Sequence, residues 1–116
     1  MVDPDDPPRW WTVDEANAVL EQVRTQAARA RAALSAAGGN GHGAAARAEL
    51  ATVLAELEAD GILLRDIQRG LVDFPARAPT GRSYWLCWLL DEDAVGWWHW
   101  PEDGFAGRTP LSDPPG

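Results

Sequence analysis

The sequence contains no lysine, a single cysteine and no long apolar stretch among its 116 residues. One cysteine cannot form a disulfide within the chain. The longest apolar runs fall far short of the roughly 20 residues that a membrane-spanning helix needs, and the chain does not open with a basic segment and an apolar one, as a secretion signal does. These absences predict a cytoplasmic protein without a membrane partner.

Clustered positive charge is also missing. The ten basic residues are all arginine and are outnumbered by 18 acidic ones, which gives a net charge of −8. Proteins that bind nucleic acids or anionic membranes neutralise phosphates with clusters of basic side chains. The composition therefore predicts that the protein has no nucleic-acid partner.

The length and a hydrophobic content of 46% suit a single domain with a small core. Residues 1–9 combine prolines and acidic residues with few apolar groups, so they are predicted to form a flexible tail. Residues 10–111 are the predicted domain, and the proline-containing residues 112–116 are a second flexible tail.

Two helices are predicted in the first half of the chain. Thr12 and Glu15 match a capping box, in which each side chain accepts a hydrogen bond from the other residue's backbone amide, so the first helix begins at Val13. Small apolar residues then recur in a heptad stripe as far as Ala37, where a glycine-rich segment ends the helix. A second helix over 44–60 runs back antiparallel to the first.

Shorter segments rich in aromatic and branched residues predict a sheet. We expect a strand at 62–67, extended chain at 71–75, and a hairpin of 84–90 and 95–100 with a four-residue loop over 91–94. The predicted fold class is α+β, with a long antiparallel helical hairpin packed on a small, mostly antiparallel sheet of three strands.

The register of this hairpin decides which side chains share a face. If the loop closes on Leu90 and Val95, the opposed pairs are Trp88 with Trp97, Cys87 with Trp98, Leu86 with His99, and Trp85 with Trp100. A slip of one residue changes the face on which His99 lies.

The strand over 84–90 is apolar on both of its faces. Side chains alternate between the two sides of a strand, so Trp85 and Cys87 lie on one side and Leu86 and Trp88 on the other. The helical hairpin can cover only one side. The other side needs a second chain, a ligand or the Trp-rich tail to cover it, and we expect a homodimer, since symmetric pairs are the commonest soluble oligomers.

Three side chains in the second half of the chain are candidate catalytic residues, namely His99, Asp73 and Cys87. His99 could be a general base or a metal ligand, with Glu102 and Asp103 as further candidate metal ligands, or it could be held by a backbone carbonyl in the sheet. Cys87 could be a nucleophile activated by His99, or a small buried apolar side chain.

Asp73 stands between apolar neighbours, so we expect it to accept from backbone amides or to pair with Arg77 or Arg108. The glycines around Phe105 predict a tight turn that directs Phe105 into a pocket and Arg108 back toward the domain. There Arg108 could clamp a small anionic ligand or close an internal salt bridge. The candidate ligand-binding residues are Trp88, Trp98, Glu102, Phe105 and Arg108.

Five segments together resemble the bacterial DUF2203 family of unknown function. They read WTVDEAN at 11–17, GLVDFPA at 70–76, LCW at 86–88, WH at 98–99 and GFAGR at 104–108. The resemblance covers about residues 10–111. It departs in the hairpin loop, where Asp91-Glu92 stands in place of the family's Gly-Glu pair. The resemblance implies a small prokaryotic cytoplasmic protein, and it brings no activity, substrate or cofactor with it.

Two functions follow from these observations. The first is a non-catalytic binding or assembly module that self-associates through its aromatic surface. The alternative is a small enzyme, or a protein that binds a small molecule or a metal, with its site around His99, Asp73 and Arg108. No cofactor is indicated by the sequence.

Overall fold

The computed structural model describes residues 6–38 and 43–116. Residues 1–5 of the predicted flexible tail and residues 39–42 of the glycine-rich segment lie outside the described residues. None of the helices in the described part of the chain is long and apolar enough to cross a membrane.

Three helices form the first layer, α1 (Val13–Ala18), α2 (Leu20–Ala37) and α3 (Gly43–Ala59). The predicted capping box is confirmed, because Thr12 Oγ1 accepts from the Glu15 amide at 3.1 Å and the Glu15 carboxylate accepts from the Thr12 amide at 2.9 Å. The single helix predicted from Val13 to Ala37 is divided at Val19, whose ψ of 7° is not helical. The heptad stripe is buried where it meets the sheet, at Ala16, Leu20, Val23, Ala27 and Ala30.

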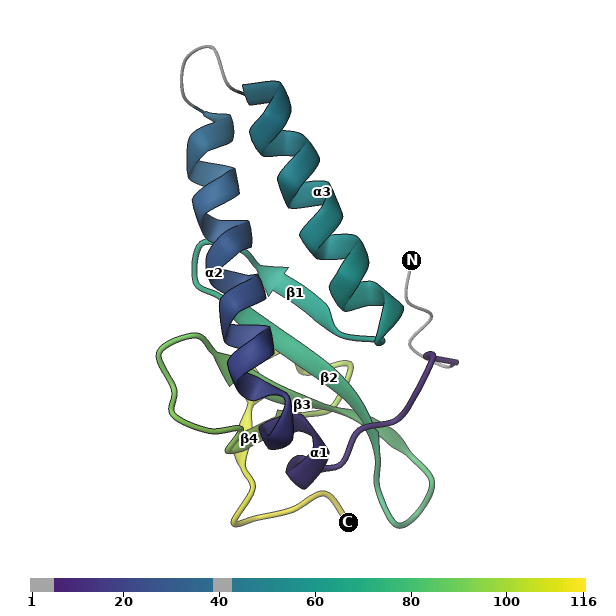
Figure 1. The fold of residues 1–116 in the computed structure, drawn as a ribbon. Helices are drawn as coiled ribbons and strands as arrows, with labels where there is room; N and C mark the ends of the chain where they lie inside the picture. The colour runs from purple at the N-terminus through teal and green to yellow at the C-terminus, as the bar shows by residue number, and fades with distance from the viewer. Residues whose placement is uncertain (1–5, 39–42) are drawn as a thin grey trace.

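Helices α2 and α3 lie antiparallel, and their ends project beyond the sheet (Figure 1). Arg29 of α2 joins them by ion pairs to Glu49 at 2.5 Å and Glu56 at 3.4 Å. The molecule is accordingly elongated, with principal extents of 51 × 26 × 26 Å.

The second layer is an antiparallel sheet of five strands in the order of the chain. The strands are β1 (Leu63–Asp66), β2 (Leu71–Arg77), β3 (Ser83–Leu89), β4 (Trp97–His99) and β5 (Thr109–Pro110). The α+β class is confirmed, whereas the prediction of three strands is wrong. Two strands make the difference. The segment predicted only as extended chain at 71–75 forms β2, and β5 was missed because a two-residue strand that contains a proline is too short to show a period of two.

The hairpin register differs by one residue from the predicted one. Cys87 pairs with Trp97, Leu86 with Trp98, and Trp85 with His99. The connection between β3 and β4 covers residues 90–96 rather than a four-residue loop. His99 therefore lies on the same side of the sheet as Trp85 and Cys87.

The two sides of the sheet carry different residues. The helix-facing side carries Val72, Phe74, Leu86 and Trp88, which are all 0% exposed and belong to the core with Trp11. The opposite side, called the second face below, carries Asp73, Trp85, Cys87, Trp97 and His99.

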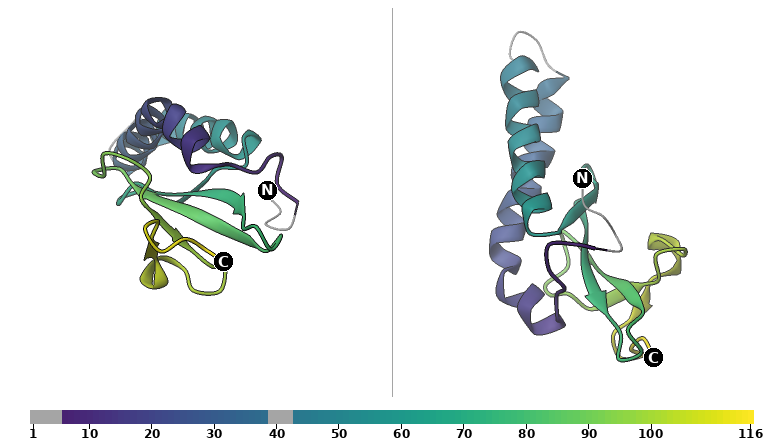
Figure 2. Two further views of the ribbon diagram at one scale, coloured as in Figure 1. Left: turned by 90° about the horizontal axis from the view of Figure 1, so that it is seen from below. Right: turned by 90° about the vertical axis from the view of Figure 1, so that its right-hand side faces the viewer.

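The second face is covered by the chain itself. The segment after β4 folds over it, including the 3₁₀ turn η1 (Phe105–Gly107), and in Figure 2 this segment and the helices lie on opposite sides of the sheet. Trp85 is 3% exposed and Cys87 is 0% exposed. The prediction that this strand is apolar and buried on both faces is confirmed.

Candidate functional site

A buried Asp73–His99 pair lies at the centre of the second face. His99 Nε2 lies 2.9 Å from Asp73 Oδ2, and His99 Nδ1 lies 2.8 Å from the carbonyl oxygen of Trp100. A carbonyl can only accept, so Nδ1 donates to it, and a shared proton must join Nε2 to the carboxylate oxygen. The two residues come from β4 and β2 and meet because the observed register places both on one face.

Arg65 is the arginine that pairs with Asp73. Its Nε donates to Asp73 Oδ2 at 3.0 Å, and its guanidinium lies over the ring of Trp85 at 4.7 Å. The expectation of Arg77 or Arg108 as the partner is wrong, since Arg77 lies over Trp10 at 4.4 Å. The ladder between β1 and β2 shifts register around Arg65, and such an irregularity re-aims a side chain without a sequence signal.

The environment favours the protonated form of His99. Burial alone would lower the pKa of His99, but the hydrogen bond and negative charge of Asp73 outweigh it and raise the pKa above its ordinary value. The carbonyl of Trp100 adds to this effect. An imidazolium that donates from both nitrogens fits both of its contacts.

Cys87 completes a cluster of three chemically different groups. Its Sγ, a carboxylate oxygen of Asp73 and a ring nitrogen of His99 all lie within 4.8 Å of one another. Burial, followed by the charge of Asp73, raises the pKa of the Cys87 thiol to about 12. Because the thiolate is the nucleophile, this environment does not activate Cys87 for covalent catalysis.

A pocket of about 280 Å³ opens beside the pair. Its walls are Arg65, Leu71, Asp73, His99, Pro101, Gly104 and Phe105. The Phe105 ring has the guanidinium of Arg69 over it at 4.4 Å and that of Arg108 at 5.1 Å. Gly104 begins this turn with a φ of 61°, which favours glycine. The predicted turn and the predicted position of Phe105 in a pocket agree with the structure.

Arg108 forms an internal salt bridge. Its Nη2 donates to Glu92 Oε2 at 2.6 Å, and its guanidinium lies over Trp97 at 4.4 Å. The side chain is 10% exposed, and its Nε is buried without a hydrogen-bond partner. Of the two roles expected for Arg108, the structure shows the salt bridge.

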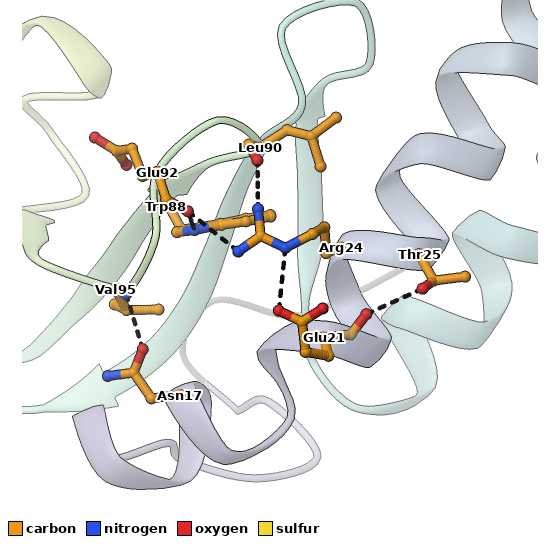
Figure 3. A network of polar contacts seen from close by, with 8 residues as sticks. All are labelled: Asn17, Glu21, Arg24, Thr25, Trp88, Leu90, Glu92 and Val95. Atoms are coloured by element: carbon orange, nitrogen blue, oxygen red, sulfur yellow. Dashed lines mark hydrogen bonds and ion pairs between the residues drawn. The ribbon is translucent and has the colours of Figure 1, made fainter.

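Glu92 was not among the predicted residues, although it holds the 90–96 connection together. Its carboxylate accepts from the Leu89 amide at 2.8 Å, and its carbonyl accepts from Trp88 Nε1 at 2.9 Å and from Arg24 at 3.3 Å. Figure 3 shows Arg24 reaching from α2 to this connection. The one available signal was the Gly-Glu pair of the resembling family, of which this chain keeps the glutamate.

Four predicted site residues lie away from the pocket. Trp88 belongs to the helix-facing core, and Trp98 shares the side of Leu86, with its Nε1 donating to the carbonyl of Asp113 at 2.8 Å. Glu102 pairs with Arg82 at the surface, and Asp103 is exposed. The structure therefore brings together Asp73, Cys87, His99 and Phe105 and places Trp88, Trp98, Glu102 and Asp103 elsewhere.

Comparison with known proteins identifies a family. The model of a family described as "Uncharacterized conserved protein (DUF2203)" matches residues 35–111, which confirms the family drawn from the sequence, while the segment at 11–17 lies outside the matched residues. No curated protein and no solved structure matches the chain.

Proposed function

Because residues 35–111 match its family model, the chain belongs to the DUF2203 family of uncharacterized conserved proteins, and from its site we propose that it binds a small anionic ligand. The ligand occupies the pocket that Arg65, His99 and Phe105 line. The observation that carries this proposal is the gathering of positive side chains around one small pocket in a chain of net charge −8.

Arg65 is the residue best suited to hold the anion. Its Nε is fixed by Asp73, and among the described residues no protein atom forms a hydrogen bond with its two Nη atoms. The side chain is 42% exposed, so it stays accessible to a ligand. A guanidinium fixed at one nitrogen presents the others in a planar fork that suits a carboxylate or phosphate.

The charges around the pocket favour an anion. Arg69 and Arg108 lie over the ring of Phe105, which lines the pocket. The pKa of His99 is raised, because the hydrogen bond and charge of Asp73 outweigh the effect of burial. Glu92 pairs with Arg108, and Asp73 in the pocket wall pairs with both Arg65 and His99, so these two carboxylates offset two of the positive charges. A volume of about 280 Å³ lies just below the range of about 300–1,000 Å³ for small-molecule sites, so a compact carboxylate or phosphate fits better than a large cofactor.

The test is a binding experiment on metal-free protein with inorganic phosphate and citrate as probes. We expect at least one probe to raise the melting temperature of the wild-type protein, with an effect that weakens as salt is added. Arg65→Gln should weaken binding by at least about tenfold, because it removes a charged fork at the site.

Arg82→Gln is the matched control, since Arg82 lies over Trp100 and pairs with Glu102 outside the pocket. It should bind the probe as the wild type does. Equal binding by the Arg65→Gln variant would contradict the proposal, as would a wild-type protein that no probe stabilises.

Self-association remains a separate prediction. It was based on an uncovered aromatic face, but Trp85 and Cys87 on that face are buried within one chain, so no specific observation favours self-association. Light scattering at micromolar concentration tests it directly. A dimer would support the prediction, and a monomer would contradict it.

A further inference from the structure

We propose that Asp73, Cys87 and His99 form a binding site for a divalent transition-metal ion of the zinc type. This site lies beneath the anion pocket and uses a different ligand chemistry. It does not depend on the proposed anion binding, although Asp73 and His99 border both sites.

The sheet places the three side chains where a metal site needs them. Asp73 of β2 lies directly opposite Cys87 of β3, and His99 of β4 is paired with Trp85, two residues from Cys87 on the same face. Their ligand atoms lie within 4.8 Å of one another. Tetrahedral zinc bonds of 2.0–2.3 Å separate ligand atoms by about 3.3–3.8 Å, so side-chain shifts of about 1 Å would close the site.

His99 is already held in the orientation of a metal ligand. Its Nδ1 donates to the carbonyl of Trp100 at 2.8 Å, and this leaves Nε2 as the atom that faces the cluster. Metal-binding histidines usually donate their second ring N–H to a carbonyl or carboxylate in this way. Nε2 lies 2.9 Å from Asp73 Oδ2 and shares a proton with that carboxylate, so an ion that displaces this proton gains the Nε2 lone pair as a ligand.

Asp73 supplies the observation that points most directly to a missing partner. Its Oδ1 is buried without a hydrogen bond from a nitrogen or oxygen donor, and its side chain is 3% exposed. The Cys87 thiol, a weak donor, is the other polar group that interacts with this carboxylate. A buried carboxylate oxygen without a partner is costly. Oδ2 is meanwhile fixed by Arg65 Nε, so Oδ1 is the atom left for an ion.

The donor set selects the metal class. One nitrogen, one sulfur and one oxygen suit zinc and cobalt, whereas magnesium and calcium require sites built from oxygen alone. Three protein ligands leave a fourth position open, as in catalytic zinc sites.

The nearby arginines do not prevent metal binding. The ion displaces the thiol proton of Cys87 and the proton shared by His99 and Asp73, so two positive charges enter while two protons leave. Arg65 and Arg108 therefore face a cluster of unchanged net charge.

The experiment uses the untagged full-length protein. We expect metal analysis of protein purified without chelator to find zinc in it. After removal of that metal, Co²⁺ should bind at one ion per chain and produce the thiolate-to-cobalt charge-transfer absorption, which Zn²⁺ then abolishes by displacing the cobalt. Cys87→Ser should remove this absorption, and His99→Gln should weaken cobalt binding by at least about tenfold.

Glu102→Gln is the control, because Glu102 is a surface acid outside the cluster, and it should bind cobalt as the wild type does. A folded wild-type protein that contains no metal and gives no thiolate absorption with Co²⁺ would overturn the proposal. So would unchanged absorption in the Cys87→Ser variant. The anion experiment uses metal-free protein and the metal experiment uses no anion probe. Failure of anion binding can therefore be told apart from failure of metal binding.

Discussion

The two sides of one sheet have different compositions although they are built from the same strands. On β2, Val72 and Phe74 point to the helices, and Asp73 between them lies on the second face. On β3, Trp88 points to the helices and Cys87 lies on the second face. The helix-facing side contains apolar side chains and is closed by the helices. The second face holds polar and charged groups and is closed by a short segment that leaves a pocket. We therefore expect side chains on the helix-facing side to contribute most to the free energy of unfolding, and side chains on the second face to bind ligands.

The largest expected effect comes from truncating a core side chain on the helix-facing side. Trp88→Ala should lower the free energy of unfolding by about 3–5 kcal/mol, because it leaves a cavity in a fully buried position. Trp97→Ala on the second face should cost under about 2 kcal/mol, since Trp97 is partly exposed. Urea denaturation measures both values. Equal losses would contradict the division between the two sides.

The next largest effect comes from the charge of Asp73. In metal-free protein, Asp73→Asn should lower the free energy of unfolding by about 2–3 kcal/mol near pH 6, because it removes the partner of two cationic groups from a buried site. The pKa of His99 is raised in the folded protein. The stabilisation by the Asp73–His99 pair is therefore complete below pH 6.5, the ordinary value for histidine, and is lost as pH rises through the raised pKa.

Denaturation of both proteins across pH 5–9 in the presence of EDTA measures this dependence. The gap between the wild type and the Asp73→Asn variant should narrow with increasing pH. A gap that widens with pH would show that His99 is not the group that titrates.

The smallest expected effect comes from removing the Glu92–Arg108 salt bridge. Glu92→Gln removes the ionic partner of the nearly buried Arg108 and should cost about 1–2 kcal/mol. Glu102→Gln removes the partner of the exposed Arg82 and should change stability by less than about 0.5 kcal/mol. Thermal denaturation of the two variants gives the comparison, and equal effects would show that the Glu92–Arg108 pair contributes no more than a surface ion pair.

The sequence predicted those features that depend on neighbouring residues. The capping box at Thr12 needs only residues three positions apart, and the alternation along β3 needs only its own side chains, so both were found. The hairpin register depends on contacts from outside the hairpin. Asn17 accepts from the Val95 amide at 2.8 Å, and Arg24 donates to the carbonyl of Leu90 at 2.7 Å. No local pattern reveals such contacts.

The sequence predicted only part of the candidate site, because the rest depends on contacts between residues that are distant in the chain. Asp73, Cys87 and His99 were recognised by their chemistry, but their proximity follows from the register, which was one residue away from the predicted one. Arg65 was missed because an irregular ladder between β1 and β2 aims it at Asp73. The predicted register paired His99 with Leu86 and so placed it on the side of Trp88, whereas the observed pairing with Trp85 places it on the opposite side. Trp98 is the neighbour of His99 in β4 and therefore points away from it.

The most direct test of the difference between the two sides is the location of a bound metal in a crystal. Crystals grown with zinc should show one strong anomalous peak at the zinc absorption edge, between Asp73, Cys87 and His99 on the second face. An ordered structure of this cluster without such a peak, or with zinc bound only at surface acids, would contradict the assignment of metal chemistry to this side of the sheet.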